Sequence, residues 1–141
     1  MWVEHDGGRA DAGYKGQTRH DCVVRAIAIA TEQPYQSVYD AINDAAKTER
    51  PRRGGKRSNA RTGVKIPTIR RYLASVGWKW HPTIGIGTGC RVHLRASELP
   101  SGRLIVSVSR HVVAVIDGVI HDTHDPSRQG TRCVYGYWRK E

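Results

Sequence analysis

The chain has 141 residues, a length that suits one domain around one hydrophobic core. Apolar residues make up 38% of the sequence and charged residues 26%, which excludes a disordered chain and favours a globular one. The formal net charge of +10 favours nucleic acid, acidic proteins or anionic surfaces as partners, through long-range attraction.

No apolar run approaches the roughly 20 residues that a membrane span needs, so we expect no contact with a membrane. The N-terminal stretch MWVEHDGGRADAGYKG has neither the basic start nor the apolar core of a secretory signal. The three cysteines, at positions 22, 90 and 133, are an odd and sparse set, which argues against a disulfide framework and for a reducing compartment. We therefore expect a cytoplasmic protein.

The first predicted helix covers about residues 20–32. Its apolar residues recur at spacings that place them on one buried face. Asp21 or Thr18 could cap its N-terminus through a side-chain oxygen. The residues of the buried face are Cys22, Val23, Ala26, Ile27 and Ala30.

Two further helices are predicted in the first half of the chain. The second begins at Pro34 and covers about residues 34–48, where apolar residues again follow helical spacing. The third covers about residues 66–76, with Pro67 suited to a first turn and Gly77 to a C-terminal stop.

A basic segment at residues 49–63, ERPRRGGKRSNARTG, separates the second and third predicted helices. It has no evident apolar anchor, so we expect a mobile surface loop that could contact nucleic acid or an acidic protein. Trp78 and Trp80 could stack on bases, although their shared strand face favours packing in the core. The basic residues of the loop are Arg50, Arg52, Arg53, Lys56, Arg57 and Arg61.

The second half of the chain contains short β-branched and aromatic runs separated by Gly, Pro and Asp, which is typical of strands. Together the halves predict an α+β fold of one domain, residues 1–141, with a helical half (about 18–77) packed on an antiparallel β half (about 78–140). The glycine-rich segment TIGIGTG, residues 83–89, is a connector or the rim of a cleft. The predicted strands lie in WKWHP, CRVHL, RLIVSVS, HVVAVI, VIHDT and CVYGYW.

Asp117 and Gly118 give the sharpest turn signal, a type I′ hairpin turn between HVVAVI and VIHDT. Continued outward, this pairing places His111 and Asp122 on one face of the sheet as diagonal neighbours. We therefore predict that Asp122 contacts the His111 ring. His124 would lie beside them.

Cys22 stands at the start of the first predicted helix, where the partial positive charge of the helix end favours a thiolate. A cysteine on an apolar helix face is more often a packing residue. A nearby histidine and acid would instead make it a nucleophile, because the histidine can take the thiol proton. The predicted pair of His111 and Asp122 favours the nucleophile.

The segments QTRHDCVVRA and HVVAVIDGVIHD resemble the Cys–His–Asp order of papain-like cysteine peptidases, in particular compact bacteriocin-leader peptidases of bacteria and phages. The resemblance spans about residues 14–125 and implies a papain-like fold. It implies Cys22 as nucleophile, His111 as general base and Asp122 as the acid that orients the base. Gln17 would help to form the oxyanion hole, although it precedes the cysteine by five residues where the family has six.

A zinc site built on His121 and His124 is an alternative use of this region. Residues three apart on a strand point to opposite faces, so chelation would need a turn after Asp122. We expect neither a metal ion nor another cofactor. The residues that could complete such a site are Cys90, His93 or Cys133.

These patterns favour a cysteine hydrolase, in first place a peptidase that cleaves amide or isopeptide bonds of a peptide or protein substrate. Two alternatives stay open at this stage. One is a basic nucleic-acid-binding protein, and the other is a catalytically inactive papain-like interaction module.

Overall fold

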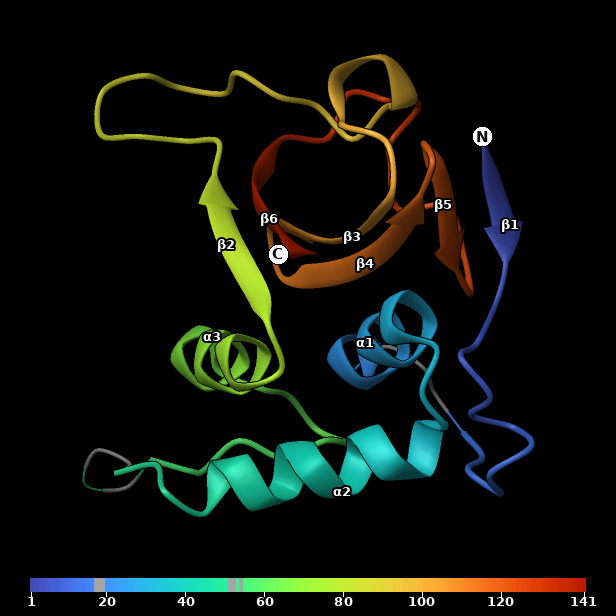
Figure 1. Cartoon of the computed structure of the whole chain (residues 1–141), viewed down its shortest axis with the longest axis vertical. Coiled ribbons are helices and arrows are strands. Elements are labelled where there is room, and N and C mark those ends of the chain that lie inside the picture. The colour runs from blue at the N-terminus through green and yellow to red at the C-terminus, as the bar shows by residue number, and fades with distance from the viewer. Residues whose placement is uncertain (17–19, 51–52, 54) are drawn as a thin grey trace.

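The computed structural model describes residues 1–16, 20–50, 53 and 55–141. Within these ranges it has three α-helices and one six-stranded sheet, so the predicted α+β class is confirmed (Figure 1). The helices are α1 (Cys22–Thr31), α2 (Tyr35–Ala46) and α3 (Ile66–Ser75). The other elements are β1 (Trp2–Glu4), β2 (Trp78–Pro82), the short 3-10 helix η1 (Ala96–Glu98), β3 (Arg103–Val108), β4 (His111–Ile116), β5 (Val119–Asp122) and β6 (Val134–Lys140).

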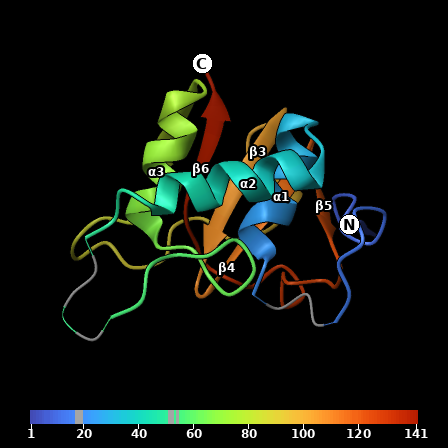
Figure 2. The same cartoon turned by 90° about the horizontal axis from the view of Figure 1, so that it is seen from below.

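The helices gather on one side of the curved sheet, with α1 and α3 next to the strands and α2 across both (Figures 1 and 2). Because α1 lies between α2 and β4, every residue from Cys22 to Ala30 is buried. The residues predicted for the buried face are therefore buried, but burial extends around the whole helix and is not limited to that face. The sequence CVVRAIAIA has small and β-branched side chains throughout, which suits a helix packed on all sides.

The predicted helix ranges are confirmed to within two residues at each end. The predicted capping role of Asp21 is wrong, because its carboxylate binds Arg9, Arg25 and Tyr35 instead. Thr18, the other proposed cap, lies outside the described residues.

The strands follow the order β1-β5-β4-β3-β6-β2 across the sheet. All neighbours are antiparallel except β1, which pairs parallel with β5. The sheet is therefore mixed, and the prediction of a purely antiparallel one is wrong at this edge. The sequence analysis missed β1. Its three residues are all exposed, so they show no alternation of apolar and polar residues that would indicate a strand.

Residues 90–94 do not form the predicted strand. They lie beside the start of β6, and a single β-bridge pairs His93 with Cys133. Cys90 also forms a disulfide with Cys133. The expectation that all three cysteines are reduced is therefore wrong for this pair. Cys22 is the one free cysteine, and all three positions lie in the described part of the chain.

The hairpin of β4 and β5 has the predicted turn and register. Both Asp117 and Gly118 adopt positive φ, at 49° and 80°, as a type I′ turn requires. Val115 pairs with Ile120 across the hairpin. This register fixes where the far ends of the two strands meet.

Two hydrophobic clusters lie on the two faces of the sheet. Successive residues of β4 alternate between them, because side chains of a strand point to opposite faces. Val112 and Ala114 pack towards the helices, and Val113 and Val115 pack on the other face.

The basic segment is anchored over its second half, contrary to the prediction. Ala60 is fully buried, and its backbone N–H donates to Asn43. The backbone N–H of Ser58 donates to Glu49, which also accepts from the Thr68 hydroxyl. Buried Ala60 and these polar contacts therefore fix this turn together. No helix in the described ranges is long and apolar enough to cross a membrane.

Candidate active site

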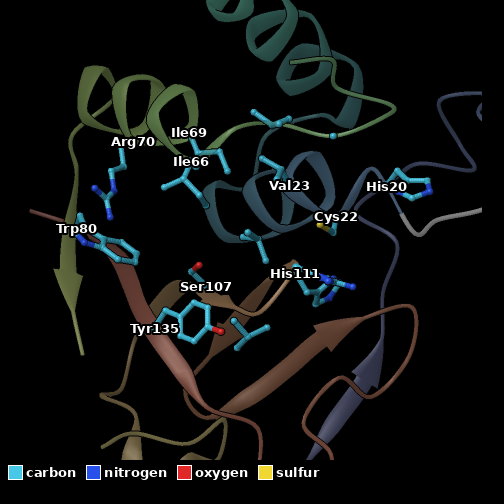
Figure 3. Close-up of a pocket in the computed structure, with 15 residues that line it drawn as sticks. His20, Cys22, Val23, Ile66, Ile69, Arg70, Trp80, Ser107, His111 and Tyr135 are labelled. Atoms are coloured by element: carbon cyan, nitrogen blue, oxygen red, sulfur yellow. The ribbon is translucent and has the colours of Figure 1, made fainter. Parts of the chain in front are cut away.

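Cys22 and His111 come together at one end of the structure, where α1 and β4 begin. Cys22 is the first residue of α1, and His111 is the first residue of β4. The two side chains lie next to each other at one end of a pocket (Figure 3). The proximity of Cys22 is one of the causes that raise the pKa of His111.

The predicted contact between His111 and Asp122 is confirmed. His111 Nε2 lies 2.6 Å from Asp122 Oδ2, and both side chains are largely buried. Because Nε2 faces the carboxylate, Nδ1 is the ring nitrogen left for the thiol of Cys22. The imidazole therefore lies between a potential nucleophile and a potential orienting acid.

The surroundings of His111 favour its protonated form. Burial alone would lower the pKa of His111. The hydrogen bond to Asp122 and the interaction with Cys22, together with the charges of both groups, outweigh burial and raise the pKa to about 9. An imidazolium at this position can hold the proton of the thiol at neutral pH.

Asp122 has a second buried partner, Arg25, which the sequence analysis did not single out. Arg25 Nη1 lies 2.6 Å from Asp122 Oδ1, and each side chain is only 2% exposed. Burial would raise the pKa of Asp122, but the bond to His111 and the charges of His111 and Arg25 outweigh it and lower the pKa. Asp122 is therefore held as a carboxylate.

The network continues from Arg25 into the protein interior. Arg25 Nε lies 3.1 Å from Asp21, which also binds Arg9 Nε at 2.8 Å and accepts from the Tyr35 hydroxyl at 2.7 Å. Asp122 and Asp21 raise the pKa of Arg25 against the effect of its burial. Charges of alternating sign thus run from Arg9 to His111. The signal in the sequence was a single arginine inside the apolar run CVVRAIAIA, since a buried charge needs partners.

His124 lies beside His111, with ring centroids 5.4 Å apart, and its Nδ1 is 4.0 Å from Asp122. The ligand atoms of His111, Asp122 and His124 lie within 4.8 Å of one another, so these three could approach one metal ion. The guanidinium of Arg25, bonded to the same carboxylate, opposes a cation there.

The zinc site considered from sequence does not assemble. His121 faces His5, with 3.2 Å between their Nδ1 atoms, and not His124. Cys90 and Cys133 are bonded to each other, and His93 contacts Glu98.

A pocket of about 440 Å³ extends from Cys22 and His111 towards α3. Its walls include Val23 from α1, Ile66 and Ile69 from α3, and Trp80 from β2 (Figure 3). None of residues 83–89 lines it, so the glycine-rich segment is not its rim. Trp80 packs against Trp138, and Trp78 is buried, which agrees with core packing.

Two of the predicted site residues, Gln17 and Arg52, lie outside the described residues. The other basic positions of the loop are exposed and lie apart from the pocket. Arg57 and Arg61 reach the backbone carbonyls of Glu49 and Lys15. The other exposed basic positions are Arg50, Arg53 and Lys56.

No family model matches the chain, and comparisons with curated proteins and solved structures gave no significant match. The site must therefore be interpreted from its own chemistry.

Proposed function

We propose that the protein is a cysteine hydrolase of papain-like type that cleaves amide bonds of a peptide or protein substrate. One observation carries the proposal: the His111 ring binds Asp122 through Nε2 and interacts with Cys22 at the N-terminus of α1. A thiol, a base and an acid that orients the base are the parts that nucleophilic catalysis by cysteine requires.

In the proposed reaction, the Cys22 thiol gives its proton to His111 Nδ1, and the thiolate sulfur attacks the carbonyl carbon. The carbonyl oxygen becomes an oxyanion near the N-terminus of α1, where the backbone N–H of Cys22 and the side chain of Gln17 would donate to it. The C–N bond then breaks, and the leaving amine takes the proton from His111. A water molecule, deprotonated by His111, attacks the thioester and releases the acid.

Asp122 and Arg25 support this chemistry without touching the substrate. The carboxylate fixes the orientation of the His111 ring and stabilises its positive charge, and Arg25 keeps that carboxylate ionised.

Alkylation of Cys22 by iodoacetamide tests the nucleophile. In the oxidised protein the other two cysteines are bonded, so the reagent reports on Cys22 alone. We expect His111→Ala to slow alkylation at pH 7 at least about tenfold, since an unassisted thiol with a pKa near 8.5 is mostly protonated there. His5→Ala, a change at an exposed histidine, is the matched control and should leave the rate unchanged. Equal rates in wild type and His111→Ala would refute the proposal.

Binding of nucleic acid is the second candidate, favoured by the net charge of +10 and the exposed basic loop. It predicts a salt-dependent shift of DNA or RNA that weakens when Arg53, Lys56 and Arg57 are changed to Gln. No shift at low salt would eliminate it. An inactive interaction module is separated by Cys22→Ala, which would leave its biological effect intact.

A further inference from the structure

The pocket beside Cys22 has polar groups at the end that lies away from the cysteine. Ser107 on β3 is only 4% exposed, and its hydroxyl makes no hydrogen bond to any described residue. Figure 3 shows this hydroxyl pointing into the pocket. A hydroxyl that faces a pocket and has no protein partner can bond a water molecule, or a ligand group that displaces that water.

Arg70 brings a positive charge to the same end. Ile66, Ile69 and Arg70 line the pocket at helical spacings of three and four residues, so one face of α3 carries them all. The Arg70 guanidinium lies over the Trp80 ring, 4.8 Å from its centroid, and has no carboxylate partner among the described residues.

Gly136 leaves room for the Trp80 ring beside Ser107, and this places Ser107 and Arg70 on the same wall of the pocket. Ser107 pairs with Gly136 across β3 and β6. The Trp80 ring lies over Gly136 so closely that an added Cβ there would be 2.3 Å from a ring carbon. Along the pocket wall, the Trp80 ring therefore lies between Ser107 and the Arg70 guanidinium.

The pocket lining, among the described residues, carries positive and no negative side chains. Arg70 and Arg110 both line it, and no Asp or Glu does so among the described residues. The remaining wall is mostly apolar, with Val23, Ile66 and Ile69. An occupant that suits this lining has an aliphatic part and a carboxylate that can accept from Ser107 and Arg70.

We propose that the pocket selects peptide substrates with an acidic side chain close to the bond attacked by Cys22, the carboxylate being held by Arg70 and Ser107. The inference rests on the proposed function. It assigns Arg70 and Ser107 to substrate recognition and leaves the bond-breaking steps to Cys22 and His111.

Capped tripeptidyl vinyl sulfones, which alkylate a reactive cysteine, test the selection. In a matched series, each of the three positions carries Glu, Gln or Lys in turn, and mass spectrometry gives the rate of Cys22 modification. We expect Glu at one position to react about tenfold faster than Gln, because a hydrogen bond to a charged group contributes that much. Arg70→Gln should abolish the preference, Arg70→Glu should reverse it towards Lys, and Ser107→Ala should reduce it.

Arg71→Gln is the matched control, since it removes the same charge from a neighbouring residue of α3 whose guanidinium binds the Ala45 carbonyl outside the pocket. Its preference for Glu should equal that of the wild type. Equal rates for Glu and Gln at every position, or a preference that persists in Arg70→Gln, would overturn the inference.

Binding of the same tripeptides as amides to Cys22→Ala, followed by fluorescence anisotropy, separates the two proposals. A Glu preference in binding without any alkylation of Cys22 would refute the hydrolase and retain acid recognition. Fast alkylation by iodoacetamide without a Glu preference in either assay would retain the hydrolase and refute acid recognition.

Discussion

At the scale of single residues, Cys22 and Arg25 stand three positions apart on α1 and serve the same histidine by different routes. Cys22 interacts with the ring itself, and Arg25 binds the carboxylate that orients the ring. Arg25 also binds Asp21, so one guanidinium joins two buried acids. The orientation of His111 therefore depends on a residue that does not line the pocket.

Arg25→Met should destabilise the protein and change the titration of His111. Loss of the cation leaves Asp21 and Asp122 buried without it, at a cost of about 3–5 kcal/mol in the free energy of unfolding, measurable with urea. The negative charge of Asp122 would then act on His111 without opposition. We therefore expect the midpoint of the imidazole titration, followed by NMR, to rise above the wild-type value of about 9.

Arg25→Lys provides the control, because lysine keeps the charge but lacks the planar fork that spans both acids. Its loss of stability should be smaller than that of Arg25→Met, and the His111 midpoint should stay nearer to 9. A wild-type protein in which His111 loses its proton near pH 6.5 would contradict the arrangement.

At the scale of elements, the β4–β5 hairpin determines whether His111 and Asp122 meet. The turn at Asp117 and Gly118 sets the register, and a slip of one residue would move one of the two side chains to the other face. Gly118 is also packed closely, since an added Cβ would lie 2.8 Å from the Cβ of Ala96.

Gly118→Ala should therefore destabilise the protein by more than the cost of a positive φ alone, which is about 1–2 kcal/mol. Gly87→Ala is the matched control: its φ of 77° is close to the 80° of Gly118, and nothing lies within 4 Å of the added carbon. We expect the free energy of unfolding to fall further in Gly118→Ala than in Gly87→Ala. Equal losses would show that contact with Ala96 contributes nothing.

The elements that the sequence predicts well are those with a local cause. The helices follow from spacing within ten or twelve residues, and the hairpin follows from Asp117-Gly118 between two apolar runs. The contact of His111 with Asp122 could be derived from that register alone. The strand β1 could not, because its partner β5 lies more than a hundred residues away and its own residues are exposed.

The same limit applies to the candidate site. Asp21 stands four residues before Arg25, a local spacing, but Asp122 comes from the end of β5, and no local pattern in the sequence links it to Arg25. Ser107 could not be distinguished from any polar residue of a strand until its hydroxyl was seen to lie at a pocket. The anchors of the basic loop were missed because Asn43 lies in α2, outside the segment, and Glu49 lies at its start, nine residues before Ser58.

At the scale of the whole molecule, the disulfide ties the segment before η1 to the start of β6. Cys90 and Cys133 are 43 residues apart, and closure of a loop of that size restricts the unfolded chain by about 4 kcal/mol at 25 °C. Reduction should lower the free energy of unfolding by an amount up to that value. A thiol assay should count one free cysteine before reduction and three after it.

The double variant Cys90→Ser, Cys133→Ser is the control for this prediction. Its stability should be the same with and without reductant and close to that of the reduced wild type. A wild-type protein whose unfolding is insensitive to reductant, or that has three free thiols from the start, would contradict the bond.

The parallel edge of the sheet has a consequence in acid. His5, directly after β1, donates its backbone N–H to the carbonyl of Asp122, and its ring nitrogen lies 3.2 Å from that of His121. Two ring nitrogens at that separation can share one proton in a hydrogen bond, but the two rings repel each other when both are protonated and positively charged. Burial and the charges of His5 and Arg103 accordingly lower the pKa of His121. As the solution becomes acidic enough to charge both rings, we expect the molecule to begin opening here, and the backbone of Asp122 is the first part of the candidate site to be released.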